Sequence, residues 1–234
     1  MQTKEPAQNR LKLQKELILT SDGSHTFFVP GLGESYHSVH GAIQESGHVF
    51  IESGLKMMRK KSVRIFEMGF GSGLNALLSW DYANTNSCHI FYHTIEMFPL
   101  ETKEASQFNY PDLLEVPRKI FMALHEVEWE KKHKLSPNFE FCKSIADLRT
   151  FIPDEEYDLI FFDAFSPDAQ PDLWETAIFK ALFKAMSPGG ILTSYSVRGA
   201  FRRSLKEAGF NVEKIPGPPG KRHITRAWKE NPHP

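Results

Sequence analysis

The pattern of hydrophobic and polar residues divides the chain near residue 60. Before that point, the alternating stretches Leu17–Thr20 and Thr26–Val29 flank Ser21–Ser24, which predicts a hairpin with a tight turn. The segment Glu34–Lys60 follows, and its hydrophobic residues recur at helical spacing. We therefore expect an N-terminal unit over residues 1–60, made of a hairpin and a helical lid.

From Val63 onward, short hydrophobic runs alternate with segments of helical spacing, a pattern typical of an α/β fold. The predicted strands are Arg64–Met68, His89–Glu96, Phe139–Cys142, Asp158–Asp163, Ile191–Ser196, Asn211–Ile215 and Arg222–Trp228. The predicted helices begin near Gly73, Pro99, Ile145, Asp172 and Gly199. Residues 216–220 are too few for a crossover helix, so the last two strands should be antiparallel. Residues 61–234 should form one Rossmann-like domain with a mostly parallel, seven-stranded sheet.

Composition is that of an ordinary globular protein, with 41% hydrophobic and 24% charged residues among 234. The sequence holds no hydrophobic run of the roughly 18–20 residues that a membrane helix needs. Met1–Leu17 lacks the hydrophobic core of a signal peptide. Cys88 and Cys142 are too few for a disulfide scaffold and are not spaced as metal ligands. We expect a cytoplasmic protein with no membrane or metal partner.

Charge is unevenly distributed, although the net charge is only −1. Between Arg198 and Lys229, nine basic residues stand against Glu207 and Glu213, which gives this segment +7 and the remainder −8. The basic residues are Arg198, Arg202, Arg203, Lys206, Lys214, Lys221, Arg222, Arg226 and Lys229. Such a segment can bind phosphates, and it can equally be a solvated surface.

A glycine-rich loop follows the first strand of the sheet and opens a helix, where a nucleotide-like ligand is bound in such folds. Its glycines are Gly69, Gly71 and Gly73, and the last glycine of a dinucleotide-binding loop is replaced by Leu74. Glu67 would repel a pyrophosphate at the loop entrance. S-adenosylmethionine carries an ammonium and a sulfonium and no phosphate, so a nearby carboxylate suits it.

The second strand ends at Glu96, about twenty residues beyond the loop, where an acidic residue can accept both ribose hydroxyls. The glycine loop, Glu67, Glu96 and the terminal hairpin together predict a class I S-adenosylmethionine-dependent methyltransferase.

The fourth strand ends in Asp163-Ala164-Phe165-Ser166-Pro167. Methylation of an amine requires a neutral nitrogen aligned with the methyl–sulfur bond, and an oxygen that accepts the amine's protons can orient it. We assign this role to Asp163, and we expect Phe165 to stack on a target base. The alternatives are a carboxylate that caps the next helix and an ordinary core aromatic.

The same residues carry a family resemblance that extends in order from about Asp22 to the C-terminus. The matching motifs are Phe66–Asn75, Ile95–Leu100, Phe162–Pro167, Pro171–Trp174, Pro188–Gly190, Phe201–Phe210 and Gly220–Arg222. They resemble the methyltransferase half of MnmC, the bacterial bifunctional enzyme of the tRNA wobble uridine. The resemblance implies methylation of the 5-aminomethyl group of 2-thiouridine in the tRNA anticodon.

Carried over by position, the resemblance implies a cofactor site and a substrate site. The cofactor residues would be Glu67, Gly69, Phe70, Gly71, Gly73, Asn75, Glu96, Met97 and Asp163. The substrate residues would be Gln44 and Glu45 in a lid that spans Tyr36–Ser46, with Arg198, Arg202, Arg203, Lys221 and Arg222. For His37, His40 and His48, we expect surface or structural roles rather than metal binding.

Two departures from the family pattern bear on function. Ser144 occupies the place of the usual acidic residue after the third strand, so we expect backbone groups there to recognise adenine. No counterpart of the flavin-dependent oxidoreductase half follows Pro234, which predicts a stand-alone methyltransferase and leaves a separate flavoprotein as a partner. The competing hypotheses are a small-molecule amine methyltransferase, a tRNA-binding module without catalysis and an NAD-dependent oxidoreductase.

Overall fold

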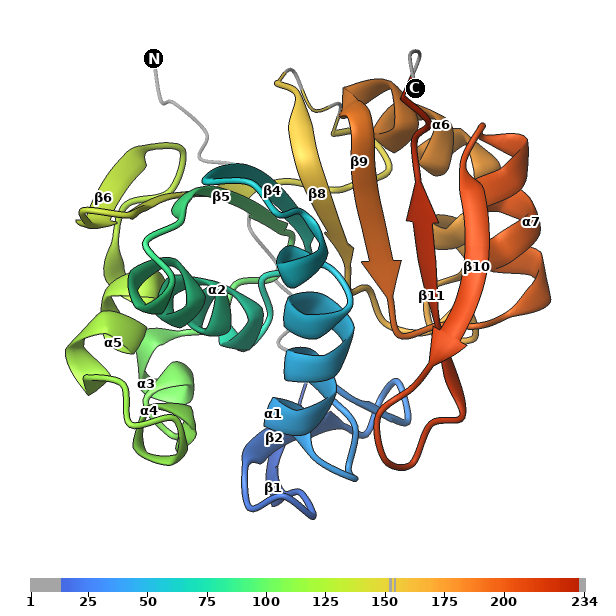
Figure 1. The fold of residues 1–234 in the computed structure, drawn as a ribbon. Coiled ribbons are helices and arrows are strands. Elements are labelled where there is room, and N and C mark those ends of the chain that lie inside the picture. The colour runs from blue at the N-terminus through green and yellow to red at the C-terminus, as the bar shows by residue number, and fades with distance from the viewer. Residues whose placement is uncertain (1–13, 152, 154, 232–234) are drawn as a thin grey trace, which may run out of the picture.

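A twisted eight-stranded sheet forms the centre of the computed structural model, which describes residues 14–231 apart from 152 and 154 (Figure 1). The order of its strands is β10-β11-β9-β8-β4-β5-β7-β6. Their bounds are β4 Ser62–Met68, β5 His89–Glu96, β6 Lys132–Ser136, β7 Phe139–Ile145, β8 Tyr157–Phe162, β9 Met186–Ser194, β10 Asn211–Pro216 and β11 His223–Trp228. Strands β9, β8, β4, β5 and β7 run parallel, and β6, β11 and β10 pair antiparallel.

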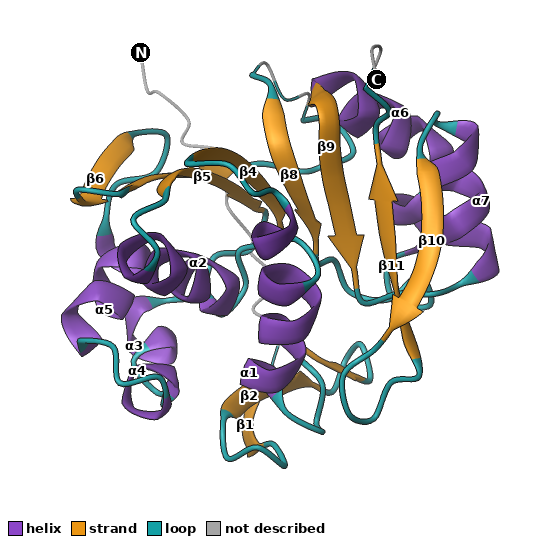
Figure 2. Ribbon diagram, viewed as in Figure 1, coloured by secondary structure: helices purple, strands orange, loops and turns teal. Residues whose placement is uncertain are grey.

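Helices cover both faces of the sheet, as buried parallel strands require (Figure 2). On one face lie α2 (Leu74–Thr85) and α5 (Arg118–Glu126), and the short helices α3 (Thr102–Ala105) and α4 (Tyr110–Leu113) contact α5. The other packs against α6 (Thr176–Ala185) and α7 (Gly199–Glu207), with the 3-10 turn η3 (Pro171–Trp174) before them. The residues of β8 are almost all buried, which fits its hydrophobic residues Leu159–Phe162.

The N-terminal segment forms a small sheet of its own and then a helical stretch. Its strands are β1 (Glu16–Leu19), β2 (His25–Val29) and β3 (Glu34–Ser35). The helix α1 (Ala42–Ser46) continues as the π-helix η1 (Gly47–Glu52) and the 3-10 turn η2 (Leu55–Met57). Asp22 in the β1–β2 turn accepts a hydrogen bond from the backbone N–H of Gln44, so the hairpin holds the start of α1.

The structure confirms the α/β class, the mostly parallel sheet, the antiparallel ending and the N-terminal hairpin. It corrects the number of strands from seven to eight, because β6 was not predicted. Its sequence, Lys-His-Lys-Leu-Ser, is too polar to signal a strand, and it pairs only with β7 at the edge of the sheet. The helix expected over Glu34–Lys60 begins only at Ala42, since Glu34 and Ser35 form a strand and residues 36–41 form bends and turns.

The helix expected near Ile145 is wrong. Strand β7 continues through Ile145, and the described residues between β7 and β8 form turns instead. Leu148 and Phe151 from this connection fill the sheet face, and the Phe151 ring stacks on Phe66 with 5.8 Å between centroids. Pro153 disfavours a helical continuation. The connection therefore covers this face of the sheet with hydrophobic side chains although it forms no helix.

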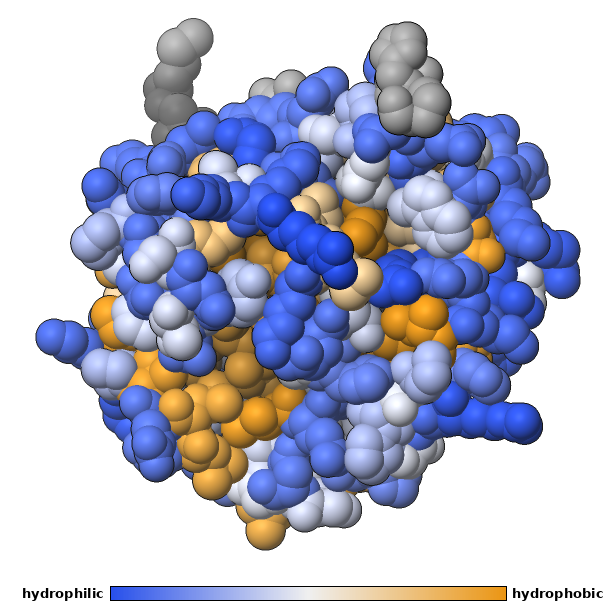
Figure 3. Space-filling model, viewed as in Figure 1, coloured by the Kyte–Doolittle hydropathy of each residue, from blue (hydrophilic) through white to orange (hydrophobic). Residues whose placement is uncertain are grey.

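The surface seen in Figure 3 is mainly hydrophilic, with hydrophobic residues gathered toward the lower left of the view. Among the described residues, no helix combines the length and hydrophobicity needed to cross a lipid bilayer.

Candidate active site

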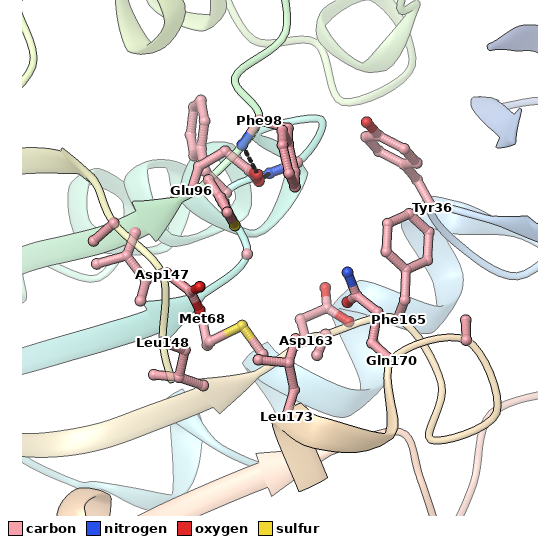
Figure 4. A pocket seen from close by; sticks show the side chains of 18 of the residues that line it. Tyr36, Met68, Glu96, Phe98, Asp147, Leu148, Asp163, Phe165, Gln170 and Leu173 are labelled. Carbon is pink, nitrogen blue, oxygen red and sulfur yellow. Dashed lines mark hydrogen bonds between the residues drawn. The ribbon is translucent and has the colours of Figure 1, made fainter. Parts of the chain in front are cut away.

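A cavity of about 920 Å³ opens at the carboxyl ends of β4, β5, β7 and β8. This is where ligands bind in open α/β sheets. Its walls come from the glycine loop after β4, the segments after β5, β7 and β8, and the N-terminal lid. In Figure 4, Glu96, Asp147, Asp163 and Tyr36 surround this space from different elements.

Most of the predicted cofactor and catalytic residues line this one cavity. The residues so placed are Gly69, Phe70, Gly71, Asn75, Glu96, Met97, Asp163 and Phe165. Three predicted residues are not part of the lining: Glu67, Gly73 and Ser144. Gly73 precedes α2 as its N-cap, with φ at 75°.

The glycine loop is fixed by its neighbours in the sheet. The N–H groups of Gly69 and Phe70 both donate to the carbonyl of Ile95 at the end of β5, at 3.1 and 3.2 Å. Gly69 has a φ of 92°, and a Cβ added there would lie 3.0 Å from the carbonyl oxygen of Asp163. Only glycine fits this conformation without strain, and the close approach places the loop directly beside the end of β8.

Glu96 connects the glycine loop to the segment after β5. One carboxylate oxygen accepts the N–H of Gly71 at 3.0 Å, and the other accepts the N–H of Phe98 at 2.8 Å. A carboxylate has about four acceptor positions, so two remain free toward the cavity. The placement matches what a ribose diol requires, while Met97 and Phe98 lie exposed at the rim.

Glu67 lies beneath the loop rather than at its entrance. Its side chain is fully buried, and burial raises the pKa of its carboxyl to about 8. The polar side chains of Thr94, Tyr92 and Asn75 oppose this rise, although neither carboxyl oxygen makes a hydrogen bond of good geometry within the described part of the chain. A carboxyl of this pKa is mostly neutral at pH 7, and a cationic ligand nearby would favour its ionised form.

Asp163 stands at the cavity wall where β8 ends. The Asn75 Nδ2 donates to its Oδ2 at 2.8 Å. Burial raises the pKa of Asp163 to about 7, with Glu45 adding to the rise and the Asn75 hydrogen bond and Lys221 opposing it. A carboxyl of this pKa can change protonation state near neutral pH, as a proton acceptor must.

The segment after Asp163 is held by hydrogen bonds from separate elements. The Tyr195 hydroxyl donates to the carbonyl of Ala164 at 2.8 Å, and Trp174 Nε1 donates to the carbonyl of Phe165 at 3.0 Å. The Phe165 ring lies edge-on to Tyr36 from the lid, with 5.5 Å between ring centroids. This segment is thus held by side chains from η3, from the end of β9 and from the N-terminal segment.

Ser144 does not fit the predicted adenine site. Its side chain is buried and hydrogen-bonds His93 Nε2 at 3.1 Å, away from the cavity lining. Asp147, three residues later, lines the cavity and accepts hydrogen bonds from the Arg149 guanidinium at 2.6–2.9 Å. An acidic group is therefore present after this strand, displaced because β7 is longer than predicted.

Two histidines hydrogen-bond Ser72 in the glycine loop, and the sequence had not placed either of them in the site. His37 Nε2 pairs with the Ser72 Oγ at 2.7 Å, and His125 Nε2 pairs with its carbonyl at 3.2 Å. Burial lowers the pKa of His37 to about 4 and that of His125 to about 3, so both rings are neutral at pH 7. His37 thus has a structural role at the cavity wall.

Lys143 holds the end of the helix that carries His125. It is fully buried, and its Nζ donates to the carbonyls of Leu124 and His125 at the end of α5. A cation near the C-terminus of a helix is favourable, and Trp129 lies 4.5 Å from the same nitrogen.

The predicted substrate residues fall into two groups. Glu45 and Lys221 form an ion pair between the lid and the β10–β11 loop, and the Lys221 Nζ lies 4.3 Å from the Tyr195 ring centroid. The side chains of Gln44, Arg203 and Arg222 are on the surface, Arg202 is half-buried, and Arg198 pairs with Asp168. Tyr36 and Arg149 also line the cavity, although neither was among the predicted site residues.

His40 and His48 are placed beside the same β10–β11 loop. His48 Nε2 lies 2.9 Å from the carbonyl of Pro216, and the His40 ring packs against Gly220. Across the residues that the structure describes, no group of three His, Cys, Asp or Glu side chains is arranged to hold a metal ion.

The donor set of the cavity fits S-adenosylmethionine. Among the charged residues that line it, four are acidic and one is basic: Glu96, Asp147, Asp163 and Asp172, and Arg149. Glu67 lies buried close beneath, and the glycine loop brings backbone against the space. Acidic side chains suit an ammonium and a sulfonium, whereas a pyrophosphate would be repelled.

Comparisons with known proteins agree with this assignment. A family model described as S-adenosyl-L-methionine-dependent methyltransferase matches residues 119–230. The tRNA 5-methylaminomethyl-2-thiouridine biosynthesis bifunctional protein MnmC of Chromobacterium violaceum is 30% identical over 216 residues, which are 86% of this chain and 33% of that protein. The MnmC of Aromatoleum aromaticum is 32% identical over 227 residues, 90% of this chain and 34% of that protein.

A solved structure shares the fold. The crystal structure of MNMC2 from Aquifex aeolicus superposes with a TM-score of 0.78 at 26% identity, covering 96% of this chain and 73% of that one. The chain belongs to the S-adenosyl-L-methionine-dependent methyltransferases and is similar to the methyltransferase part of MnmC. It spans about a third of the length of the curated MnmC relatives that it matches. The resemblance noted in the sequence motifs is thereby confirmed, and the cofactor of this family of methyltransferases is S-adenosylmethionine.

Proposed function

We propose that the protein transfers a methyl group from S-adenosylmethionine to the amine of 5-aminomethyl-(2-thio)uridine at the wobble position of tRNA. The observation that carries this proposal is Asp163, a carboxyl with a pKa near neutrality that lines the predicted cofactor cavity beside an aromatic residue, Phe165. The names of the relatives supply the substrate class.

Each residue of the site has a defined task in this proposal. Glu96 and the glycine loop would hold the cofactor, Asp147 would accept from its adenine end, and the buried carboxyl of Glu67 would lie near its cationic part. When bound, S-adenosylmethionine supplies an electrophilic methyl group. Asp163, oriented by Asn75, accepts a proton from the substrate amine, and Phe165 stacks on the uracil ring.

The partners and setting follow from the same proposal. Residues 1–60 would act as a lid over the domain of residues 61–234, in the cytoplasm, where tRNA is modified. The anticodon stem-loop would contact the basic residues Arg198, Arg202, Arg203, Lys221 and Arg222. A flavoprotein oxidoreductase would deliver the free amine.

The value of kcat/KM should rise with pH and level off above about pH 7, because kcat/KM reports the ionisation of the free enzyme. Asp163 must be ionised to accept a proton, and its pKa is raised to about 7, so below that pH the active fraction falls about tenfold per unit. A profile of kcat/KM on tRNA tests this, with Asp163→Asn as the control, because that variant should lose the limb that titrates near 7. A wild-type kcat/KM that is constant between about pH 6 and pH 8 would contradict the assignment.

Reversing the charge of Arg202 and Arg203 to Glu should weaken tRNA binding and flatten its dependence on salt. Each phosphate contact that is lost lowers the slope of log K against log salt by roughly 1. Binding titrations at several salt concentrations measure this, with Lys56→Glu as a control on an exposed ion pair away from the cavity. An unchanged slope would assign both arginines to a solvated surface and would favour a small-molecule amine as the substrate.

A further inference from the structure

One side chain of the N-terminal segment reaches the loop that carries Asp163. Glu34 in β3 accepts hydrogen bonds from both the backbone N–H of Ser166, at 3.0 Å, and the Ser166 hydroxyl. The two residues are 132 positions apart in sequence, and both are partly buried. A single carboxylate therefore binds one residue of this loop at two points.

A turn of the chain also begins at Ser166. Its carbonyl accepts the N–H groups of Ala169 and Gln170 at 3.0 and 2.9 Å, and its hydroxyl oxygen accepts the N–H of Asp168 at 3.3 Å. The hydroxyl donates its own proton to Glu34. Fixing Ser166 thus fixes the start of the turn that forms one wall of the cavity.

The residues of the loop before Ser166 are held by other hydrogen bonds, whereas Ser166 at its end is held by Glu34. Tyr195 holds the carbonyl of Ala164, and Trp174 holds that of Phe165. Both anchors come from the core side of the domain, whereas Glu34 and Tyr36 come from the N-terminal segment. The Phe165 ring lies between these two sets of contacts, and Figure 4 shows it between Tyr36 and Asp163.

We propose that Glu34 is a positioning residue for methyl transfer, which fixes the loop Asp163–Ser166 so that Asp163 and Phe165 face the acceptor. This inference rests on the proposed function of Asp163. A carboxylate suits the task because it accepts from an amide and a hydroxyl at once, and charge-assisted hydrogen bonds of this kind are stronger than neutral ones. Glutamine would keep one acceptor oxygen and lose the charge.

Kinetics of variants in the N-terminal segment test the proposal. Glu34→Ala should lower kcat by about 10- to 100-fold, the scale of a 1 Å misplacement, with little change in the KM for S-adenosylmethionine. Glu34→Gln should retain part of the activity, because one hydrogen bond survives. The control is Glu52→Gln, which removes a carboxylate of the same segment from an exposed ion pair with Lys56. A kcat for Glu34→Ala equal to that of Glu52→Gln would overturn the proposal.

A double-variant comparison separates positioning from a general loss of fold. If Glu34 acts through Ser166, the effects of Glu34→Ala and Ser166→Ala on kcat should not add, and the double variant should resemble Glu34→Ala alone. Strict additivity, or a fall in cofactor affinity as large as the fall in kcat, would contradict the proposal.

Amide hydrogen exchange tests the contact without any substrate. Residues 163–170 should exchange faster in Glu34→Ala than in the wild type and in Glu52→Gln, while the core strand β8 stays protected. Unchanged exchange would overturn the inference even if wild-type turnover on tRNA is absent. A wild type that methylates no tRNA, with exchange altered as expected, would instead refute the proposed function and leave the contact in place.

Discussion

Asp163→Asn should lower turnover about 100-fold or more while S-adenosylmethionine still binds, because the variant removes a proton acceptor and keeps its shape. The Asn75 amide donates to one oxygen of Asp163, and the Oδ1 of an asparagine can accept the same hydrogen bond. The cavity wall should therefore stay in place. What is lost is the carboxylate that burial holds at a pKa of about 7.

Single-turnover transfer and calorimetric titration of the cofactor measure the two effects separately. Asp81→Asn on α2 is a matched control, since it makes the same chemical change outside the cavity lining. Turnover that is equal in both variants would remove Asp163 from the mechanism. A loss of cofactor affinity in Asp163→Asn equal to the loss of turnover would assign the residue to binding alone.

Gly69→Ala should lower the free energy of unfolding by about 1–3 kcal/mol and reduce turnover by about 100-fold. At a φ of 92°, an L side chain is strained, and the new Cβ would lie 3.0 Å from the carbonyl oxygen of Asp163. Relief of this contact requires the glycine loop or the end of β8 to shift. Either shift displaces a wall of the cavity.

Gly47→Ala is the control for this change. Gly47 opens η1 with a φ of −57°, and a Cβ there meets no atom within 4 Å. That substitution should be neutral or stabilising by about 0.4–1 kcal/mol. Chemical denaturation of both variants gives the comparison. Equal stability of Gly69→Ala and the wild type would show that the loop and Asp163 are not in the contact described.

The fold was predictable as far as the hydrophobic pattern reports it. Strands β4, β5 and β8 are largely hydrophobic, and the two strands of the terminal hairpin are joined by a short segment rich in proline and glycine, so these elements followed from the sequence. Strand β6 did not, because an edge strand needs no hydrophobic face and its residues are mostly charged or polar. The length of β7 was underestimated for a related reason, since Lys143 is buried there despite its charge.

The site was predictable where a motif fixes the backbone. Gly69, Glu96 and Asp163 lie at the ends of strands, and parallel strands bring such ends together. Glu34, His37 and His125 could not be found in this way, because they reach the site only through packing of the N-terminal segment and α5. Ser144 was misplaced because the position of the acidic residue depends on where β7 ends.

The central claim is methyl transfer to the wobble aminomethyl-uridine of tRNA. The most direct measurement is incubation with labelled S-adenosylmethionine and tRNA that lacks this modification, followed by nucleoside analysis. We expect label in 5-methylaminomethyl-uridine or its 2-thio form, and about 100-fold less with Asp163→Asn. Cofactor binding without label in any tRNA nucleoside would contradict the claim.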